Sequence, residues 1–149
     1  MIGLITQNPK FYFGENYSKV LNNIAISVGV EGLYDLPQYS VDWPDFKPDI
    51  AITFGPDSKH WDSPVHYKIE NKINWLIIHS KDDQWIDEKQ PNTMYNHLKS
   101  QQTTETKIIE KILIKRSHFE VIEEMCSSND QITVPVLDLI QRVAKQQSK

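Results

Sequence analysis

The feature that most constrains the fold is a short apolar run, Trp75 to Ile78, which ends abruptly in polar residues. The run is long enough for a strand buried on both faces but too short for a helix. The residues that follow it, 79–83, read His-Ser-Lys-Asp-Asp and are typical of a turn. Open α/β sheets bind ligands beyond the carboxyl ends of their strands, so a carboxylate just past a buried strand is a candidate acid. We choose Asp83, with Asp82 as the alternative; the simpler interpretation is that both only solvate a loop.

A histidine that can pair with this acid follows the next predicted strand. Met94 and Leu98 recur at helical spacing, and residues 107–114 are β-branched and partly alternating, as in a strand. Strand, helix and strand within about 40 residues form a parallel crossover unit. Its carboxyl ends lie side by side, so we expect Asp83 and His118 to meet. A carboxylate that orients a histidine acting as general base belongs to a nucleophilic triad, although a purely structural role for His118 stays open.

The rest of the chain fits a single α/β domain over residues 1–149. Residues 24–30 are strongly β-branched and predict a third buried strand. A helix that opens at Pro135 is expected to cover the last strand, and residues 1–23 are compatible with either helix or loop. The predicted strands of the parallel sheet are 24–30, 74–79 and 107–114.

A long segment, residues 33–72, contains five prolines and shows no sustained period, which is typical of a lid or binding insertion. Its large aromatic residues could flank a flat aromatic substrate, or they could simply fill the core. They are Trp43, Trp61 and Tyr67. No metal site is predicted, because the ligand types in this segment lack a recognisable spacing. These are His60, Asp62 and His66.

Composition excludes several classes of protein. The net charge of −4 makes a nucleic-acid partner unexpected, and no apolar run approaches the roughly 20 residues of a membrane helix. No signal peptide is visible, and the single cysteine, Cys126, fits a buried thiol in a reducing compartment, so a cytoplasmic location is expected. Nothing in the sequence indicates a metal or organic cofactor.

The pieces around Asp83 and His118 also resemble a known family. His-Ser-Lys-Asp-Asp-Gln, a helix, a strand and then Ser-His-Phe-Glu-Val-Ile are similar to the end of an α/β-hydrolase. Within that superfamily the chain is most similar to kynurenine formamidase (arylformamidase). Residues 30–36 (Val-Glu-Gly-Leu-Tyr-Asp-Leu), Trp43-Pro44 and residues 62–67 (Asp-Ser-Pro-Val-His-Tyr) resemble the segment between that family's nucleophile and its acid.

The resemblance implies the carboxyl-terminal half of a three-layer α/β-hydrolase. It implies hydrolysis of N-formylkynurenine to kynurenine and formate, a step of tryptophan catabolism, without a cofactor, in which Asp83 orients His118. The nucleophile is missing: neither Gly-x-Ser-x-Gly nor an oxyanion loop of His-Gly-Gly form occurs. Ser27 has the looser Ala-x-Ser-x-Gly surroundings, but a turn rather than a helix follows it, which argues against a nucleophile elbow.

Two classes of function follow. The first is a fragment of a formamidase-like enzyme that is inactive alone, or of an esterase of other specificity, acting on a small aromatic formamide or ester. The second is a non-catalytic hydrolase remnant that acts in protein association. Under either, the apolar strand at 24–30 would be an open sheet edge, so we expect it to pair with a second copy or with a separate amino-terminal piece.

Overall fold

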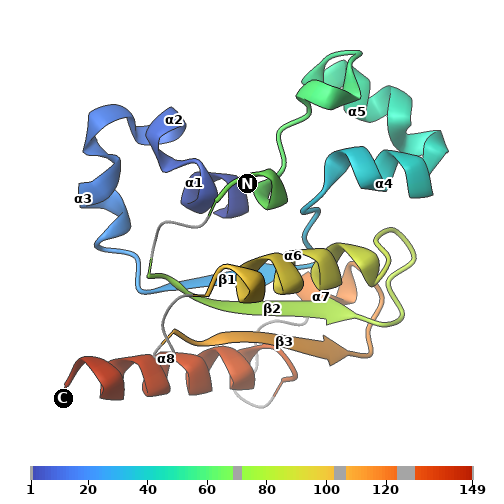
Figure 1. Cartoon of the computed structure of the whole chain (residues 1–149). Coiled ribbons are helices and arrows are strands. Elements are labelled where there is room, and N and C mark those ends of the chain that lie inside the picture. The colour runs from blue at the N-terminus through green and yellow to red at the C-terminus, as the bar shows by residue number, and fades with distance from the viewer. Residues whose placement is uncertain (1, 69–71, 103–106, 124–129, 149) are drawn as a thin grey trace.

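The computed structural model describes residues 2–68, 72–102, 107–123 and 130–148 (Figure 1). Its centre is a sheet of three parallel strands in the order β1–β2–β3. They are β1 (Ile26–Val30), β2 (Asn74–Ser80) and β3 (Ile109–Ile114). The three predicted strands and their parallel arrangement are confirmed, with ends that differ by one or two residues. The chain is therefore an α/β protein.

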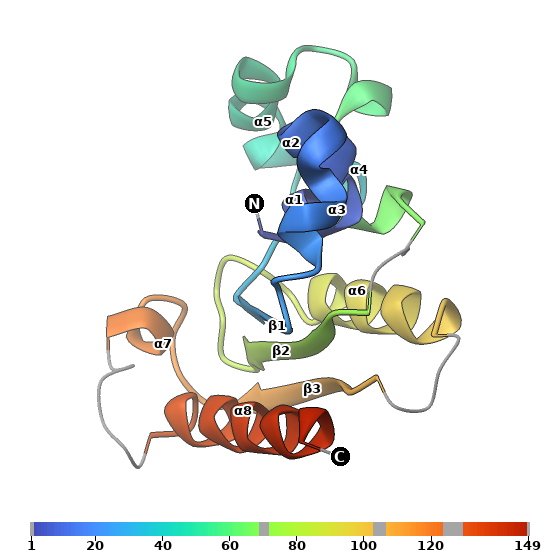
Figure 2. The ribbon, with the colours of Figure 1, turned by 90° about the vertical axis from the view of Figure 1, so that its left-hand side faces the viewer.

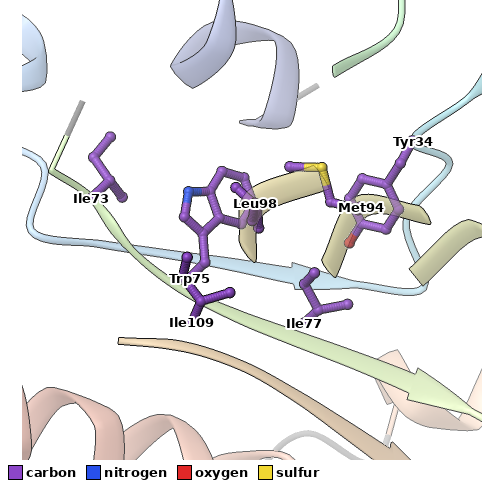
Figure 3. Close-up of a cluster of buried hydrophobic side chains, with 7 residues drawn as sticks. All are labelled: Tyr34, Ile73, Trp75, Ile77, Met94, Leu98 and Ile109. Atoms are coloured by element: carbon purple, nitrogen blue, oxygen red, sulfur yellow. The ribbon is translucent and has the colours of Figure 1, made fainter. Parts of the chain in front are cut away.

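The central strand, β2, is buried along its whole length. Successive strand residues point to opposite faces of a sheet, so each face of β2 needs its own cover. On one face Trp75 and Ile77 pack beneath α6 (Lys89–Ser100), in the cluster drawn in Figure 3. The buried members of this cluster are Tyr34, Ile73, Trp75, Ile77, Met94, Leu98 and Ile109.

On the opposite face Leu76 and Ile78 pack against α8 (Thr133–Gln147), the helix predicted to open at Pro135. Figure 2 shows α6 and α8 on opposite sides of the sheet. The buried members of this second cluster are Leu76, Ile78, Ile114, Val121, Ile132, Leu139 and Val143. Each fully buried aliphatic side chain contributes about 1.5–3 kcal/mol, so the double cover explains why β2 is apolar from Trp75 to Ile78, between Asn74 at its start and His79 and Ser80 at its end.

The other helices form two groups on the α6 side of the sheet (Figures 1 and 2). The first group comprises α1 (Ile2–Gln7), α2 (Pro9–Phe13), the 3-10 turn Gly14–Asn16 and α3 (Tyr17–Leu21). The second comprises α4 (Leu36–Asp42), α5 (Lys47–Phe54) and the 3-10 turns Pro44–Phe46, Ser58–His60 and Pro64–His66. A short α7 (Glu120–Glu123) follows β3. No helix within the described residues is long and apolar enough to cross a membrane.

The segment 33–72 is more regular than the sequence predicts. The expectation of an irregular insertion is wrong over 36–54, where α4 and α5 lie. The physical reason is the position of the prolines, which occupy the first turns of helices. A first-turn proline needs no backbone N–H and already has a helical φ. The prolines at such positions are Pro37, Pro44, Pro48 and Pro64.

Tyr34 fixes the turn that follows β1. Its ring lies so close to Gly29 and Gly32 that a Cβ on either residue would overlap the Tyr34 hydroxyl. The ring is only 3% exposed, and its hydroxyl has no hydrogen-bond partner among the described residues. Burial, reinforced by the nearby Glu31, raises the pKa of this hydroxyl above its ordinary value. Glycine at 29 and 32 is thus required by a close approach.

We predict that Gly29→Ala lowers the free energy of unfolding by about 1–3 kcal/mol, because the added methyl group meets Tyr34. Urea denaturation measures the change. Tyr34→Phe alone should be neutral or stabilising, since it removes a buried unpaired hydroxyl, and it should recover part of the loss in the double variant. An equal loss with and without the hydroxyl would contradict this packing.

Candidate active site

The carboxyl ends of β2 and β3 are joined by the hydroxyl of Ser80. Ser80 Oγ accepts hydrogen bonds from the backbone N–H groups of Asp82 (3.1 Å) and Arg116 (2.9 Å), and it donates to the carbonyl of Arg116. The serine thus connects the loop that carries Asp83 to the loop that carries His118. Its hydroxyl therefore serves to hold this turn.

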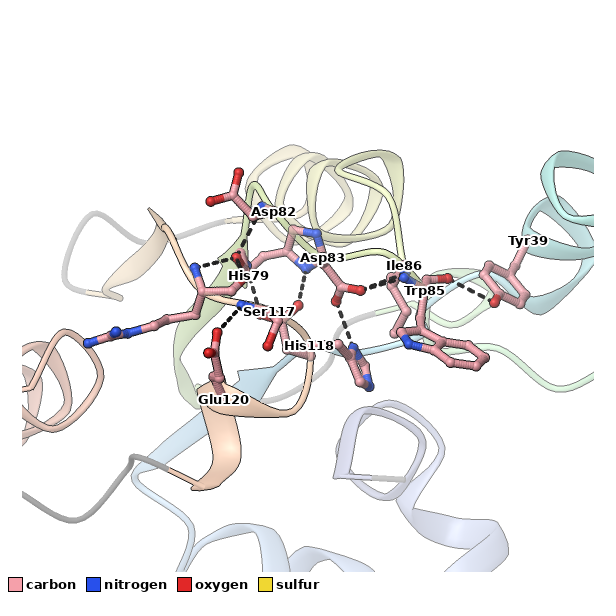
Figure 4. A network of polar contacts seen from close by, with 12 residues as sticks. Tyr39, His79, Asp82, Asp83, Trp85, Ile86, Ser117, His118 and Glu120 are labelled. Atoms are coloured by element: carbon pink, nitrogen blue, oxygen red, sulfur yellow. Dashed lines mark hydrogen bonds and ion pairs between the residues drawn. The ribbon is translucent and has the colours of Figure 1, made fainter.

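The carboxylate of Asp83 is held by two backbone hydrogen bonds in addition to its contact with His118. Its Oδ1 accepts hydrogen bonds from the backbone N–H groups of Trp85 (2.7 Å) and Ile86 (2.9 Å), as Figure 4 shows. Its Oδ2 lies 2.7 Å from Nδ1 of His118, and its side chain has no exposed surface. The structure therefore brings together the predicted acid and base, and it distinguishes Asp83 from the exposed Asp82.

His118 is held in one orientation from two sides. Its loop leads into α7, where Glu120 accepts a hydrogen bond from the Ser117 N–H (2.8 Å). The ring of Phe119 meets the imidazole edge to face, with centroids 5.1 Å apart. Because Nδ1 donates to Asp83, Nε2 is left as the acceptor, and Figure 4 shows this nitrogen pointing away from Asp83. The imidazole, 18% exposed, is thus arranged to take a proton from outside the pair.

The charge of Asp83 is stabilised by its neighbours. Burial alone would raise the pKa of Asp83, but hydrogen bonds from Glu31, His118 and the amides of Trp85 and Ile86 outweigh it. The pKa of Asp83 consequently lies below its ordinary value, and the carboxylate stays ionised at neutral pH. An ionised acid is what a histidine needs in order to hold its Nδ1 proton and to become positively charged in a transition state.

Glu31 and His79 complete the site, and the sequence did not predict either of them. Glu31 lies directly after β1, accepts a hydrogen bond from the Ser80 N–H (2.7 Å) and lies 2.6 Å from Nδ1 of His79. Both side chains are 1% exposed. The signal was available, because a carboxylate just past a buried strand is the same criterion that selected Asp83.

The donor atoms of Glu31, Asp83 and His118 all lie within 4.8 Å of one another, close enough to share a cation. However, both oxygens of Asp83 already accept hydrogen bonds, and both oxygens of Glu31 face a donor. The arrangement in the structure is that of groups that share protons. No metal role follows from it.

A row of aromatic side chains leads away from His118. Phe119 contacts Trp85, and Trp85 contacts Phe46, with ring centroids 6.3 and 5.7 Å apart. Phe46 in turn meets Trp43 at 6.3 Å. Trp85 and Phe119 are 45% and 56% exposed, and the carbonyl of Trp85 accepts a hydrogen bond from the Tyr39 hydroxyl (Figure 4). We call Trp43, Phe46, Trp85 and Phe119 the aromatic row.

The three predicted pocket residues have different positions. Trp43 belongs to the aromatic row, where two rings, Phe46 and Trp85, separate it from Phe119. Trp61 is a core residue: it is 1% exposed, packs in a buried cluster with residues of α4 and α5, and donates its Nε1–H to the Gly55 carbonyl. Tyr67 donates its hydroxyl to Asp62, and its carbonyl contacts His97 of α6. The aromatic residues that lie nearest to His118 are Phe119 and, next to it, Trp85, which follow the same two strand ends as His118 and Asp83.

The structure offers no nucleophile at Ser27. This residue lies inside β1, opposite Trp75, and is 3% exposed, whereas a nucleophile elbow presents its serine on a sharp turn before a helix. The predicted buried thiol, Cys126, lies outside the described residues.

We predict that Asp83→Asn lowers the free energy of unfolding by about 1–3 kcal/mol at neutral pH, because the hydrogen bonds from His118 and from the amides of Trp85 and Ile86 lose their charged acceptor. A carboxylate with a lowered pKa stabilises the fold above its ordinary pKa of about 3.9, and this contribution disappears as the pH falls through the lowered value. The difference between the two proteins in urea denaturation should therefore shrink in acid. Asp82→Asn, the exposed neighbour, is the control and should change little at either pH.

Comparison of the chain with protein-family models, with curated proteins and with solved structures finds no match in any of the three. No family is assigned on that basis. What can be concluded about function therefore comes from the geometry of Asp83, His118 and their surroundings, together with the pattern of the sequence.

Proposed function

We propose that this chain supplies the acid and the base of a serine-hydrolase-type site of α/β-hydrolase kind. The observation that carries the proposal is the 2.7 Å contact between Asp83 Oδ2 and His118 Nδ1. The two residues follow neighbouring parallel strands, Asp83 is anchored and ionised, and His118 has a second nitrogen turned away from the acid. These are the relations that a general base requires in a triad.

In this proposal, Nε2 of His118 takes the proton of a serine hydroxyl as the serine oxygen attacks a formyl or ester carbonyl. Asp83 stabilises the imidazolium that forms, and the proton then passes to the departing amine or alcohol. Water attacks the resulting acyl-serine in the same way and releases the acid, which is formate when the substrate is a formamide. The serine and the oxyanion donors lie outside these 149 residues, since none of the motifs that carry them is present.

The substrate class that we propose is a small aromatic formamide or ester, such as N-formylkynurenine. Two features support it. The first is the resemblance of residues 30–36 and 79–84 to kynurenine formamidase. The second is the aromatic row, whose exposed Trp85 and Phe119 present flat faces and edges beside His118. An aromatic ring bound there gains about 0.5–1.5 kcal/mol per ring contact beyond simple burial.

The purified chain should show no turnover of N-formylkynurenine or a nitrophenyl ester above background, because loss of a triad's serine lowers the rate about 10⁶-fold in the subtilisin example. Mixing it with the amino-terminal half of a kynurenine formamidase, which carries the serine and the oxyanion loop, should restore measurable hydrolysis.

The restored activity should disappear with His118→Ala and survive Asp82→Asn, the matched surface control. Two results would contradict the proposal: hydrolysis by the chain alone that Ser27→Ala abolishes, or restored hydrolysis that does not depend on His118.

A second candidate function, protein association by a non-catalytic remnant, is favoured by the outer edge of β1. Within the described residues β1 pairs with β2 alone. The Ala25 carbonyl and the Glu31 N–H form hydrogen bonds with β2. Backbone groups alternate between the two sides of a strand, so those of Ile26, Val28 and Val30 point to the outer edge. An edge with three open donors and acceptors is a template for another strand.

We therefore predict that the chain associates through β1 as its concentration rises. Light scattering should show the increase in mass, and the Val28 amide should then exchange its hydrogen more slowly, whereas the Lys111 amide at the β3 edge serves as the internal control. A single monomeric species at all concentrations would exclude this association.

A further inference from the structure

Glu31 has a backbone conformation that its residue type does not favour. Its φ is +45°, and it is the one non-glycine residue with a positive φ among those the structure describes. In this region the Cβ of an L-residue crowds the following carbonyl, so glycine is the usual occupant. A glycine, which adopts a positive φ without strain, occupies the next position, Gly32, but not position 31. An unfavourable conformation of this kind persists where the surrounding structure uses the side chain.

The unusual turn directs the Glu31 carboxyl group toward the ends of β2 and β3. Oε1 accepts a hydrogen bond from the Ser80 N–H at 2.7 Å, and Oε2 lies 2.6 Å from His79 Nδ1. A carboxyl oxygen of Glu31, a carboxyl oxygen of Asp83 and a ring nitrogen of His118 all lie within 4.8 Å of one another. The titratable groups that face Glu31 are His79 of β2, Asp83 of the next loop, His118 beyond it, and Tyr34 of its own turn.

Two buried carboxyl groups this close repel each other strongly when both are ionised, so one proton held between them is the favoured state. Burial raises the pKa of Glu31, His79 opposes this, and the hydrogen bond with Asp83 adds to it, so that the pKa lies above its ordinary value. The pKa of Asp83 is shifted the other way. The shared proton therefore resides on Glu31, and the negative charge on Asp83.

We propose that Glu31 is a positioning residue for the Asp83–His118 pair, in which its neutral carboxyl group donates a hydrogen bond to Asp83 and holds Oδ2 of Asp83 against Nδ1 of His118. In this role Glu31 acts on the imidazole through Asp83 and not through a hydrogen bond of its own. The inference rests on the proposed function only in taking Asp83 and His118 as the acid and base. The alternative is that Glu31 merely pairs with His79 and shapes the turn.

Three variants separate these roles. Glu31→Gln keeps a donor for Asp83 and an acceptor for the Ser80 N–H but has no proton to lose. Glu31→Gly suits the positive φ and removes the side chain, so it preserves the turn and eliminates the contact with Asp83. Glu123→Gln, on the exposed surface of α7, makes the same chemical change away from the site and is the matched control.

The readout is the His118 ring in nitrogen and proton NMR spectra of the full chain, together with urea denaturation. In the unmodified protein and in Glu31→Gln we expect a downfield Nδ1 proton, as for a hydrogen bond to a carboxylate. In Glu31→Gly this signal should weaken or vanish while the protein stays folded. As the pH rises past the ordinary carboxyl range, the His118 signals should move once more when Glu31 ionises, and this step should be absent from Glu31→Gln alone.

The results distinguish the two proposals. If Glu31→Gly retains the downfield Nδ1 proton, or Glu31→Gln retains the extra pH step, the positioning role is wrong while the Asp83–His118 pair stands. If the unmodified protein lacks that proton and Asp83→Asn leaves the His118 spectrum unchanged, the pair itself is wrong, and both proposals fall. Should Glu31→Gly fail to fold, the pH step in Glu31→Gln decides the question.

Discussion

The structure depends on the parallel pairing of β2 with its two neighbours. Parallel pairing brings all three carboxyl ends to one edge of the sheet, and each end carries an ionisable residue: Glu31 after β1, Asp83 after β2 and His118 after β3. An antiparallel neighbour would have sent one of them to the far edge. The pairing is itself stabilised by the two apolar layers on β2, so the burial of Trp75 to Ile78 is a precondition of the polar site.

Beyond that pairing, the site relies on backbone groups as much as on side chains. Asp83 is held by the amides of Trp85 and Ile86, Glu31 by the amide of Ser80. Backbone donors of this kind are fixed by the fold and need no reorganisation when charge moves, which is the condition for a base whose partner must stabilise a transient positive charge. The positive φ of Glu31 shows that the fold accepts local strain at this point.

The aromatic row extends from His118 to one side of the site. It begins at the exposed face of Phe119 beside His118 and continues through Trp85 toward the segment 33–72. That segment is anchored by Gln90 of α6, whose Oε1 accepts hydrogen bonds from the amides of Tyr34 and Asp35 at 2.8 Å each. The segment predicted as a lid or binding insertion is thus bound to the crossover helix, and its Phe46 contacts Trp85 of the aromatic row.

The strands, their parallel arrangement, the crossover helix α6 and the contact of Asp83 with His118 could all be predicted from the amino-acid sequence. Each follows from local periodicity and from the rule that the carboxyl ends of parallel strands lie at one edge of the sheet. The sequence did not determine the helices of 36–54, Trp61 as a core residue, or the role of Glu31. Whether these helices form depends on whether each proline occupies a first turn. Whether an aromatic ring such as Trp61 is buried depends on which surface it packs against. The carboxyl groups of Glu31 and Asp83 become neighbours only once the fold has brought two distant residues together and excluded water from them. These are properties of three-dimensional neighbours, which no local pattern contains.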